Sequence, residues 1–128
     1  MPQVDLAIEH ESAFVRAFII RECRERYLSQ LALPNKRAGL LDRLNHQFNK
    51  DLDSRWIAES QPSSVPSADQ LRYIIASENE YDGRIVPARD TSEILAAALF
   101  GVVVSFAPGK LAVYKDEAPS DVIWLHRT

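Results

Sequence analysis

Apolar residues return at helical spacing through the first quarter of the chain. Every fourth position is apolar at Val15, Ile19, Cys23, Tyr27 and Leu31, which is the pattern of one face of an α-helix. Further apolar residues widen this face, so that seven of the eight positions 13–20 are apolar. The pattern predicts one helix over residues 10–31, whose first half is buried on most sides or faces another subunit.

A second helix is predicted to follow after a short connection. Pro34 ends the first helix, Asn35 is a suitable N-cap, and apolar residues recur at helical spacing from Lys36 to about Phe48. Two amphipathic helices joined by so short a connection are typical of an antiparallel helical hairpin.

The second half of the chain alternates between strand and helix patterns. Strands are predicted at 73–76, 102–106, 111–114 and 122–125, and a helix at 94–100 with Gly101 at its C′ position. Asp82-Gly83 and Pro108-Gly109 are typical tight-turn pairs. If the first two strands are neighbours, the helix between them forms a right-handed parallel crossover. The order indicates an α+β fold, in which an N-terminal helical hairpin precedes a small mixed sheet (β-α-β-β-β) with a C-terminal antiparallel hairpin.

One Pro- and Ser-rich stretch divides these halves. We expect a single domain over residues 1–128, with a helical half at about 1–60, a loop at 61–67 and a mixed α/β half at 68–128. The loop is too short to require two independent domains.

Net charge, cysteine content and the length of apolar runs limit which kinds of protein this chain can be. The 128 residues include 15 basic and 18 acidic side chains, for a net charge of −3, which argues against a nucleic-acid-binding protein. The single cysteine excludes an intrachain disulfide, and no apolar run is long enough to span a membrane. With no signal-peptide pattern at the first residues, we expect a soluble protein in the cytoplasm.

Complete catalytic and metal motifs are missing from the sequence. It contains no glycine-rich phosphate loop and no nucleophile elbow. His10-Glu11 begins like a zinc-protease motif, but Phe14 stands where the second histidine is needed. We therefore expect no metal and no cofactor, and enzymatic activity stays an open question with the balance against it.

The most suggestive cluster of charged residues lies between Glu78 and Glu93. Asp82, Arg84, Arg89 and Glu93 are the candidate ligand-binding residues, because carboxylates and guanidinium groups so close together can line a pocket for an anionic ligand. Asp90 is next to them. The alternatives are an ion-paired loop in which Asp90 and Glu93 only cap the helix, or an incomplete calcium loop starting at Glu78.

Two functional hypotheses remain. The first is a small interaction or regulatory module that binds a protein partner or itself, since the first helix is unusually apolar and Trp56 and Trp124 lie outside obvious core runs. The second is a small enzyme or anionic-ligand-binding domain that uses residues 78–93. A basic patch is a further alternative, formed by Arg16, Arg21 and Arg24 with Lys36 and Arg37 after them. Such a patch could bind an RNA, a phosphate or an acidic protein, or it could be an ordinary solvated helix face.

Overall fold

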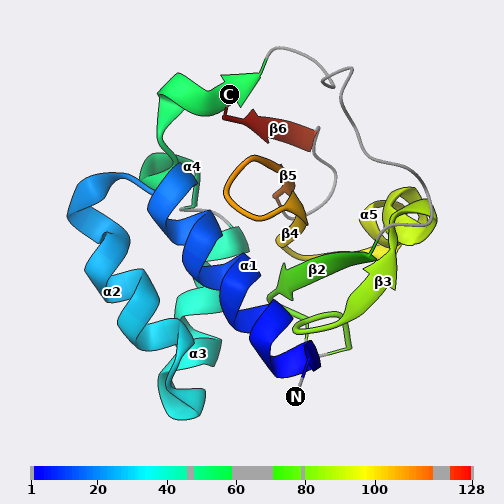
Figure 1. The fold of residues 1–128 in the computed structure, drawn as a ribbon, viewed down its shortest axis with the longest axis horizontal. Coiled ribbons are helices and arrows are strands. Elements are labelled where there is room, and N and C mark those ends of the chain that lie inside the picture. The colour runs from blue at the N-terminus through cyan, green and yellow to red at the C-terminus, as the bar shows by residue number, and fades with distance from the viewer. Residues whose placement is uncertain (1, 46–47, 59–70, 79, 117–121, 128) are drawn as a thin grey trace.

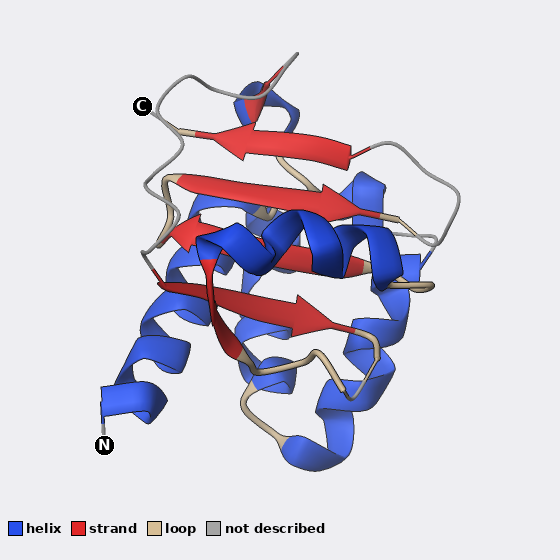
Figure 2. Cartoon of the chain, turned by 90° about the vertical axis from the view of Figure 1, so that its right-hand side faces the viewer, coloured by secondary structure: helices blue, strands red, loops and turns tan. Residues whose placement is uncertain are grey.

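The chain folds into helices packed on both faces of one antiparallel sheet (Figures 1 and 2). The computed structural model describes residues 2–45, 48–58, 71–78, 80–116 and 122–127. The α-helices are α1 (Pro2–Phe18), α2 (Arg21–Leu31), α3 (Pro34–Leu41), α4 (Phe48–Asp51) and α5 (Thr91–Ala97). The strands are β1 (Ile57–Ala58), β2 (Leu71–Ala76), β3 (Ile85–Pro87), β4 (Val102–Ala107), β5 (Leu111–Lys115) and β6 (Val122–His126). Single 3₁₀ turns, η1 to η3, cover Asp42–Asn45, Ser54–Trp56 and Ala88–Asp90.

This arrangement confirms the α+β class, with N-terminal helices followed by a sheet. The strand order is β1-β6-β5-β4-β2-β3, and every neighbouring pair is antiparallel. The predicted parallel crossover is wrong, because the short strand β3 returns beside β2 before α5 begins. The chain therefore enters β4 antiparallel to β2.

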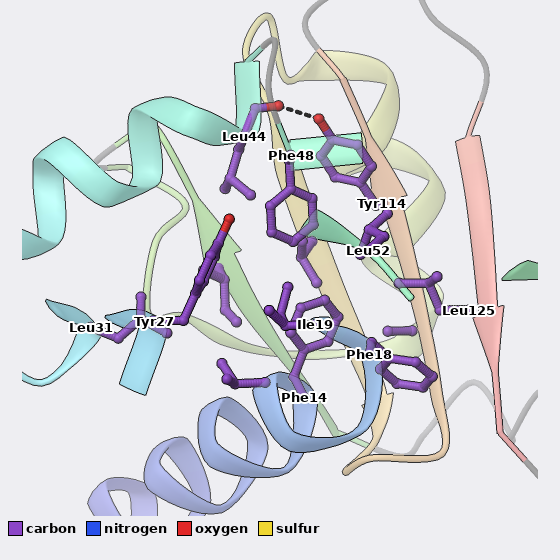
Figure 3. Close-up of a cluster of buried hydrophobic side chains, with 14 of the residues drawn as sticks. Phe14, Phe18, Ile19, Tyr27, Leu31, Leu44, Phe48, Leu52, Tyr114 and Leu125 are labelled. Carbon is purple, nitrogen blue, oxygen red and sulfur yellow. Dashed lines mark hydrogen bonds between the residues drawn. The ribbon is translucent and has the colours of Figure 1, made fainter. Parts of the chain in front are cut away.

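The central strands β2, β4 and β5 are buried on both faces of the sheet, between helices (Figure 2). Because side chains alternate along a strand, Val103 faces α1–α4 while Val102 and Val104 face the α5 side. The larger cluster, on the α1–α4 side, surrounds Phe48, whose ring centroid lies 4.7 Å from that of Tyr114 (Figure 3). The hydroxyl of Tyr114 donates a hydrogen bond to the Leu44 carbonyl across this cluster.

The predicted helix over 10–31 is broken in two. Ile20 N donates to the Asp51 carbonyl (2.8 Å), and Asp53 N donates to the Phe18 carbonyl (2.7 Å). Residues 51–53 thus pair with residues 18–20 in extended form, so α1 ends at Phe18. Helix α2 then runs beside α1 in the opposite direction (Figure 1). The predicted second helix likewise ends early, because α3 stops at Leu41 and a 3₁₀ turn follows.

The apolar stretch 13–20 packs into the hydrophobic core of the protein. Phe14, Val15, Phe18 and Ile19 are all at most 2% exposed, so this stretch is not a surface for another subunit.

The turn glycines are confirmed at two positions and corrected at a third. Gly83 and Gly109 have φ of 80° and 70°, the left-handed region that glycine adopts without strain. Gly101 is not a helix C′ residue, because α5 ends at Ala97 and Gly101 precedes β4. The predicted loop at 61–67 lies outside the described residues.

Candidate functional site

The four predicted ligand-binding residues do not share one site. Asp82 turns toward the helix layer and forms two contacts with Arg37 of α3, Nε–Oδ2 and Nη2–Oδ1, each 2.9 Å. The backbone N–H of Ala76 also donates to Asp82 Oδ1 (3.1 Å). Asp82 therefore fastens the β2–β3 turn to the helices.

Arg84 and Glu93 do come together, at a hollow of about 260 Å³ beside α5. The hollow is lined by Tyr81, Arg84, Asp90, Glu93, Ile94 and Ala97. Arg89 is exposed and is not one of these lining residues. We call this place the mixed-charge hollow. Among the ion pairs of the described residues, none includes Arg84, Asp90 or Glu93.

Sequence reasoning missed Tyr81 as a residue of this hollow. Its partly buried ring packs against the apolar cluster on the α5 side of the sheet. Burial raises the pKa of Tyr81, and the carboxylates of Glu80 and Glu78 add to the effect while Arg84 opposes it. The phenol therefore stays protonated at neutral pH and can donate a hydrogen bond into the hollow.

Two carboxylates of the incomplete calcium loop, those of Glu78 and Asp82, bind other groups of the protein, and Asn79 lies outside the described residues. Glu78 Oε1 accepts hydrogen bonds from the backbone N–H groups of Leu99 (2.8 Å) and Phe100 (3.0 Å), and Asp82 is paired with Arg37. Across the described residues, no group of three His, Cys, Asp or Glu side chains is placed to hold a metal ion.

A chain of polar contacts runs between α1 and the sheet. His10 Nδ1 and Ser105 Oγ share a hydrogen bond of 2.7 Å, and the His10 ring stacks on Tyr73 with centroids 5.8 Å apart. Tyr73 donates to Glu11, which pairs with Arg37 (2.7 Å). Burial lowers the pKa of His10, and Arg72 adds to this while Glu9 opposes it.

The His10–Ser105 pair has the residue types of a base and a nucleophile, but it has no access to a substrate. His10 is 2% exposed and Ser105 is 1% exposed, whereas a catalytic pair must reach a reacting atom. We therefore assign the pair a structural role.

Cys23 lies in a second polar cluster, around Asp51. Tyr27 donates to Asp51, and Arg43 binds the same carboxylate at 2.9 Å. The Cys23 thiol lies 3.6 Å from Asp51 Oδ1. Burial and the Asp51 carboxylate raise the pKa of Cys23, so the thiol is not activated as a nucleophile.

Three arginines of the predicted basic patch do meet. Arg16 of α1 with Arg21 and Arg24 of α2 line an open hollow of about 650 Å³, together with Glu25, Leu28 and Ser29. We call this place the arginine hollow. The other two members lie elsewhere: Arg37 points inward to Glu11 and Asp82, and Lys36 is exposed outside the lining.

The arginine hollow is held in shape by the break between α1 and α2. Arg24 Nε donates to the Ile19 carbonyl (2.8 Å), a group that the break leaves outside the helical hydrogen-bond ladder. Among the described residues, the ion pairs include neither Arg16, Arg21 nor Arg24. All three arginines thus border one open hollow, and none of them forms an ion pair with a described carboxylate.

Two more arginines lie close to this break. Arg127 lies over the Trp56 ring at 4.8 Å and Arg55 lies over it at 5.5 Å, and Arg127 Nη1 reaches the Ala17 carbonyl (3.5 Å). Arg55 also pairs with Asp53 (2.7 Å). Hydrogen bonds from Arg55, with the nearby charge of Arg24, lower the pKa of Asp53 although its partial burial acts in the opposite direction.

Comparison with known proteins adds no functional assignment. No protein-family model, no curated protein and no solved structure matches the chain. Within the described residues, no helix combines the length and apolar character needed to cross a membrane.

Proposed function

We propose that this protein is an interaction module that binds an acidic segment of a partner protein at the arginine hollow. One observation carries the proposal: Arg16, Arg21 and Arg24 converge from two helices on one open hollow, in a chain with net charge −3. Arginine is suited to this task because its planar guanidinium group binds carboxylates through two parallel hydrogen bonds.

The shape and lining of the hollow favour a peptide segment. Its volume of about 650 Å³ is open to solvent, and the partly buried side chain of Leu28 adds an apolar surface between the charged groups. An acidic segment with apolar residues at intervals therefore matches both the charge and the apolar contact, as is usual at protein interfaces.

The same surroundings disfavour nucleic acid as the partner. Sites for single-stranded nucleic acid stack bases on aromatic side chains, but the lining of the hollow includes no aromatic residue. The Trp56 ring is covered by Arg55 and Arg127. Glu25 in the lining and the net negative charge of the chain also reduce attraction to a phosphate backbone.

The test measures binding of a fluorescein-labelled peptide of alternating Glu and Leu by fluorescence anisotropy. We expect saturable binding that weakens as salt is raised to about 0.15 M, because interactions between exposed charges are then screened beyond about 8 Å. Arg21→Glu should weaken binding about tenfold or more, the equivalent of about 1.4 kcal/mol. Lys36→Glu is the matched control, since it makes the same charge change on an exposed side chain outside the hollow.

Three results would contradict the proposal. They are absence of binding, equal effects of Arg21→Glu and Lys36→Glu, or tighter binding of a short single-stranded RNA than of the peptide. Light scattering of the protein alone tests self-association: a dimer that dissociates in Arg21→Glu would identify a second copy of the chain as the occupant.

A further inference from the structure

The mixed-charge hollow is lined partly by α5, and α5 lies on the other side of the sheet from α1 and α2 (Figure 1). It is formed by the β2–β3 turn on one side and by residues 90–97 on the other. It shares no lining residue with the arginine hollow, so a substitution in one hollow leaves the lining of the other unchanged.

Charges of both signs surround this hollow without neutralising one another. Arg84 has no ion pair within 4.0 Å to Asp90 or Glu93 among the described residues, although all three line a space of about 260 Å³. Opposite charges that border one space but do not touch leave both sets of hydrogen-bonding groups available to a ligand. A ligand that carries both charges satisfies them together.

Ligands of a single charge fit this lining less well. An isolated anion would be attracted by Arg84 but repelled by Asp90 and Glu93, and an isolated metal cation would meet Arg84. The pairing of one guanidinium group with two carboxylates is therefore complementary to a zwitterion, in which a carboxylate binds Arg84 and an ammonium group binds Asp90 and Glu93.

The rest of the lining sets the size and polarity of such a ligand. Ile94 and Ala97 are one turn apart on α5 and give the hollow an apolar wall. The protonated phenol of Tyr81 adds a hydrogen-bond donor. A volume of about 260 Å³ is below the range of about 300–1,000 Å³ typical of drug-sized ligands, so the occupant is small.

Both sides of the hollow are fastened to the body of the protein. On one side, the Arg37–Asp82 pair holds the β2–β3 turn. On the other, the ammonium group of Lys115 donates to the carbonyls of Leu95 and Ala98 at the end of α5. The backbone segments that carry the charged groups are therefore held in place before a ligand binds, although the side chains of Arg84 and Glu93 are exposed.

We propose that the mixed-charge hollow binds a small zwitterion, namely a free α-amino acid with a short aliphatic side chain. Its carboxylate pairs with Arg84 and accepts from Tyr81, its ammonium group lies between Asp90 and Glu93, and its side chain packs on Ile94 and Ala97.

The first experiment is isothermal titration calorimetry with L-valine and two blocked forms. N-acetyl-L-valine lacks the ammonium charge, and L-valinamide lacks the carboxylate. We expect saturable binding of L-valine and at least about tenfold weaker binding of each blocked form, because each leaves one set of charged groups unpaired. No saturable heat with L-valine, or equal binding of the three compounds, would overturn the proposal. Tighter binding of one blocked form would identify the occupant as a simple cation or anion and would also overturn it.

The second experiment compares variants of the residues that surround the hollow. Arg84→Met and Glu93→Gln should each weaken L-valine binding about tenfold or more, and Arg84→Lys should restore part of the loss. Arg89→Met is the matched control, because Arg89 lies in the same segment but outside the lining. Thermal unfolding of each variant establishes that it is folded. Equal losses in Arg84→Met and Arg89→Met would contradict the assignment, whereas binding of the acidic peptide should be unchanged in both.

Discussion

Arg37 of α3 and Asp82 of the β2–β3 turn form a two-contact ion pair between residues that are 45 positions apart in the sequence. The same guanidinium group makes two contacts with Glu11 of α1, at 2.9 and 2.7 Å. Burial opposes the charge of Arg37, but its bonds to Asp82 and Glu11 outweigh burial and raise its pKa. One side chain thus joins two helices to the edge of the sheet.

Replacement of Arg37 by Met should destabilise the protein strongly. Arg37, Glu11 and Asp82 are each less than 20% exposed, so the change leaves two largely buried carboxylates without their cation. We expect a loss of about 3 kcal/mol in the free energy of unfolding, measured in urea. Arg55→Met breaks the Asp53 pair of a side chain that is 70% exposed and should cost much less, because an exposed ion pair adds little to stability. Similar losses of unfolding free energy in the two variants would show that the Arg37 ion pairs contribute no more to stability than an exposed pair.

The position of Asp82 could not be predicted from the sequence. Asp82 and Arg84 are two residues apart, so their proximity in sequence indicated one shared pocket. The turn at Gly83 instead sends Asp82 toward α3 and Arg84 toward α5. The partner of Asp82 is 45 residues away, and no local pattern identifies it. Asp90 and Glu93, interpreted alternatively as helix caps, both line the hollow, and Asp90 makes no side-chain cap hydrogen bond.

The predicted boundary of the first helix was also wrong because of a contact with residues distant in the sequence. The apolar spacing through residues 10–31 is continuous, and nothing within it marks an interruption at Ile19 and Ile20. The break is imposed by pairing with residues 51–53. By contrast, β2, β4, β5 and β6 were predictable because their apolar runs are local and are bounded by turn residues. The three-residue strand β3 ends in Pro87 and is too short for such a pattern.

Acid should destabilise the protein through His10. Its pKa is lowered by burial from the ordinary value of 6.5, so the unfolded chain binds a proton more readily than the folded chain. The His10 contribution to stability is therefore present above about pH 6.5 and is lost as the pH falls below it toward the lowered value. Urea unfolding across this range should show stability falling with pH in the native protein.

The His10→Gln variant isolates this effect. Glutamine retains a hydrogen-bonding group for Ser105 but does not titrate, while Glu9 and Arg72, the charged groups that act on His10, remain in place. The difference in unfolding free energy between native protein and variant should shrink as the pH falls below 6.5. A difference that is constant with pH would show that His10 does not titrate differently on folding.

Replacement of Lys115 should destabilise α5 and weaken ligand binding at the mixed-charge hollow. Its ammonium group is buried and binds the carbonyls of Leu95 and Ala98. Lys115→Met keeps the aliphatic stem but leaves these carbonyls without their donor, at a cost of about 1–3 kcal/mol. Hydrogen exchange should accelerate at the amides of α5, and L-valine binding should weaken. Unchanged exchange in α5 would show that packing alone holds this helix.

Gly101 should tolerate no side chain. A Cβ atom there would lie 2.2 Å from the Leu44 carbonyl oxygen and 2.4 Å from its carbonyl carbon, and Gly101 N donates to Asn45 Oδ1 at 2.7 Å. Because the obstacle is backbone on a buried segment, Gly101→Ala should lower the free energy of unfolding by about 3 kcal/mol or more. Gly39 in α3 is the matched control, since nothing lies within 4 Å of its added Cβ. Gly39→Ala should therefore stabilise the protein by up to about 1 kcal/mol through helix propensity. Thermal unfolding of the two variants measures opposite shifts, and a stable Gly101→Ala protein would contradict the close approach of residues 44 and 101.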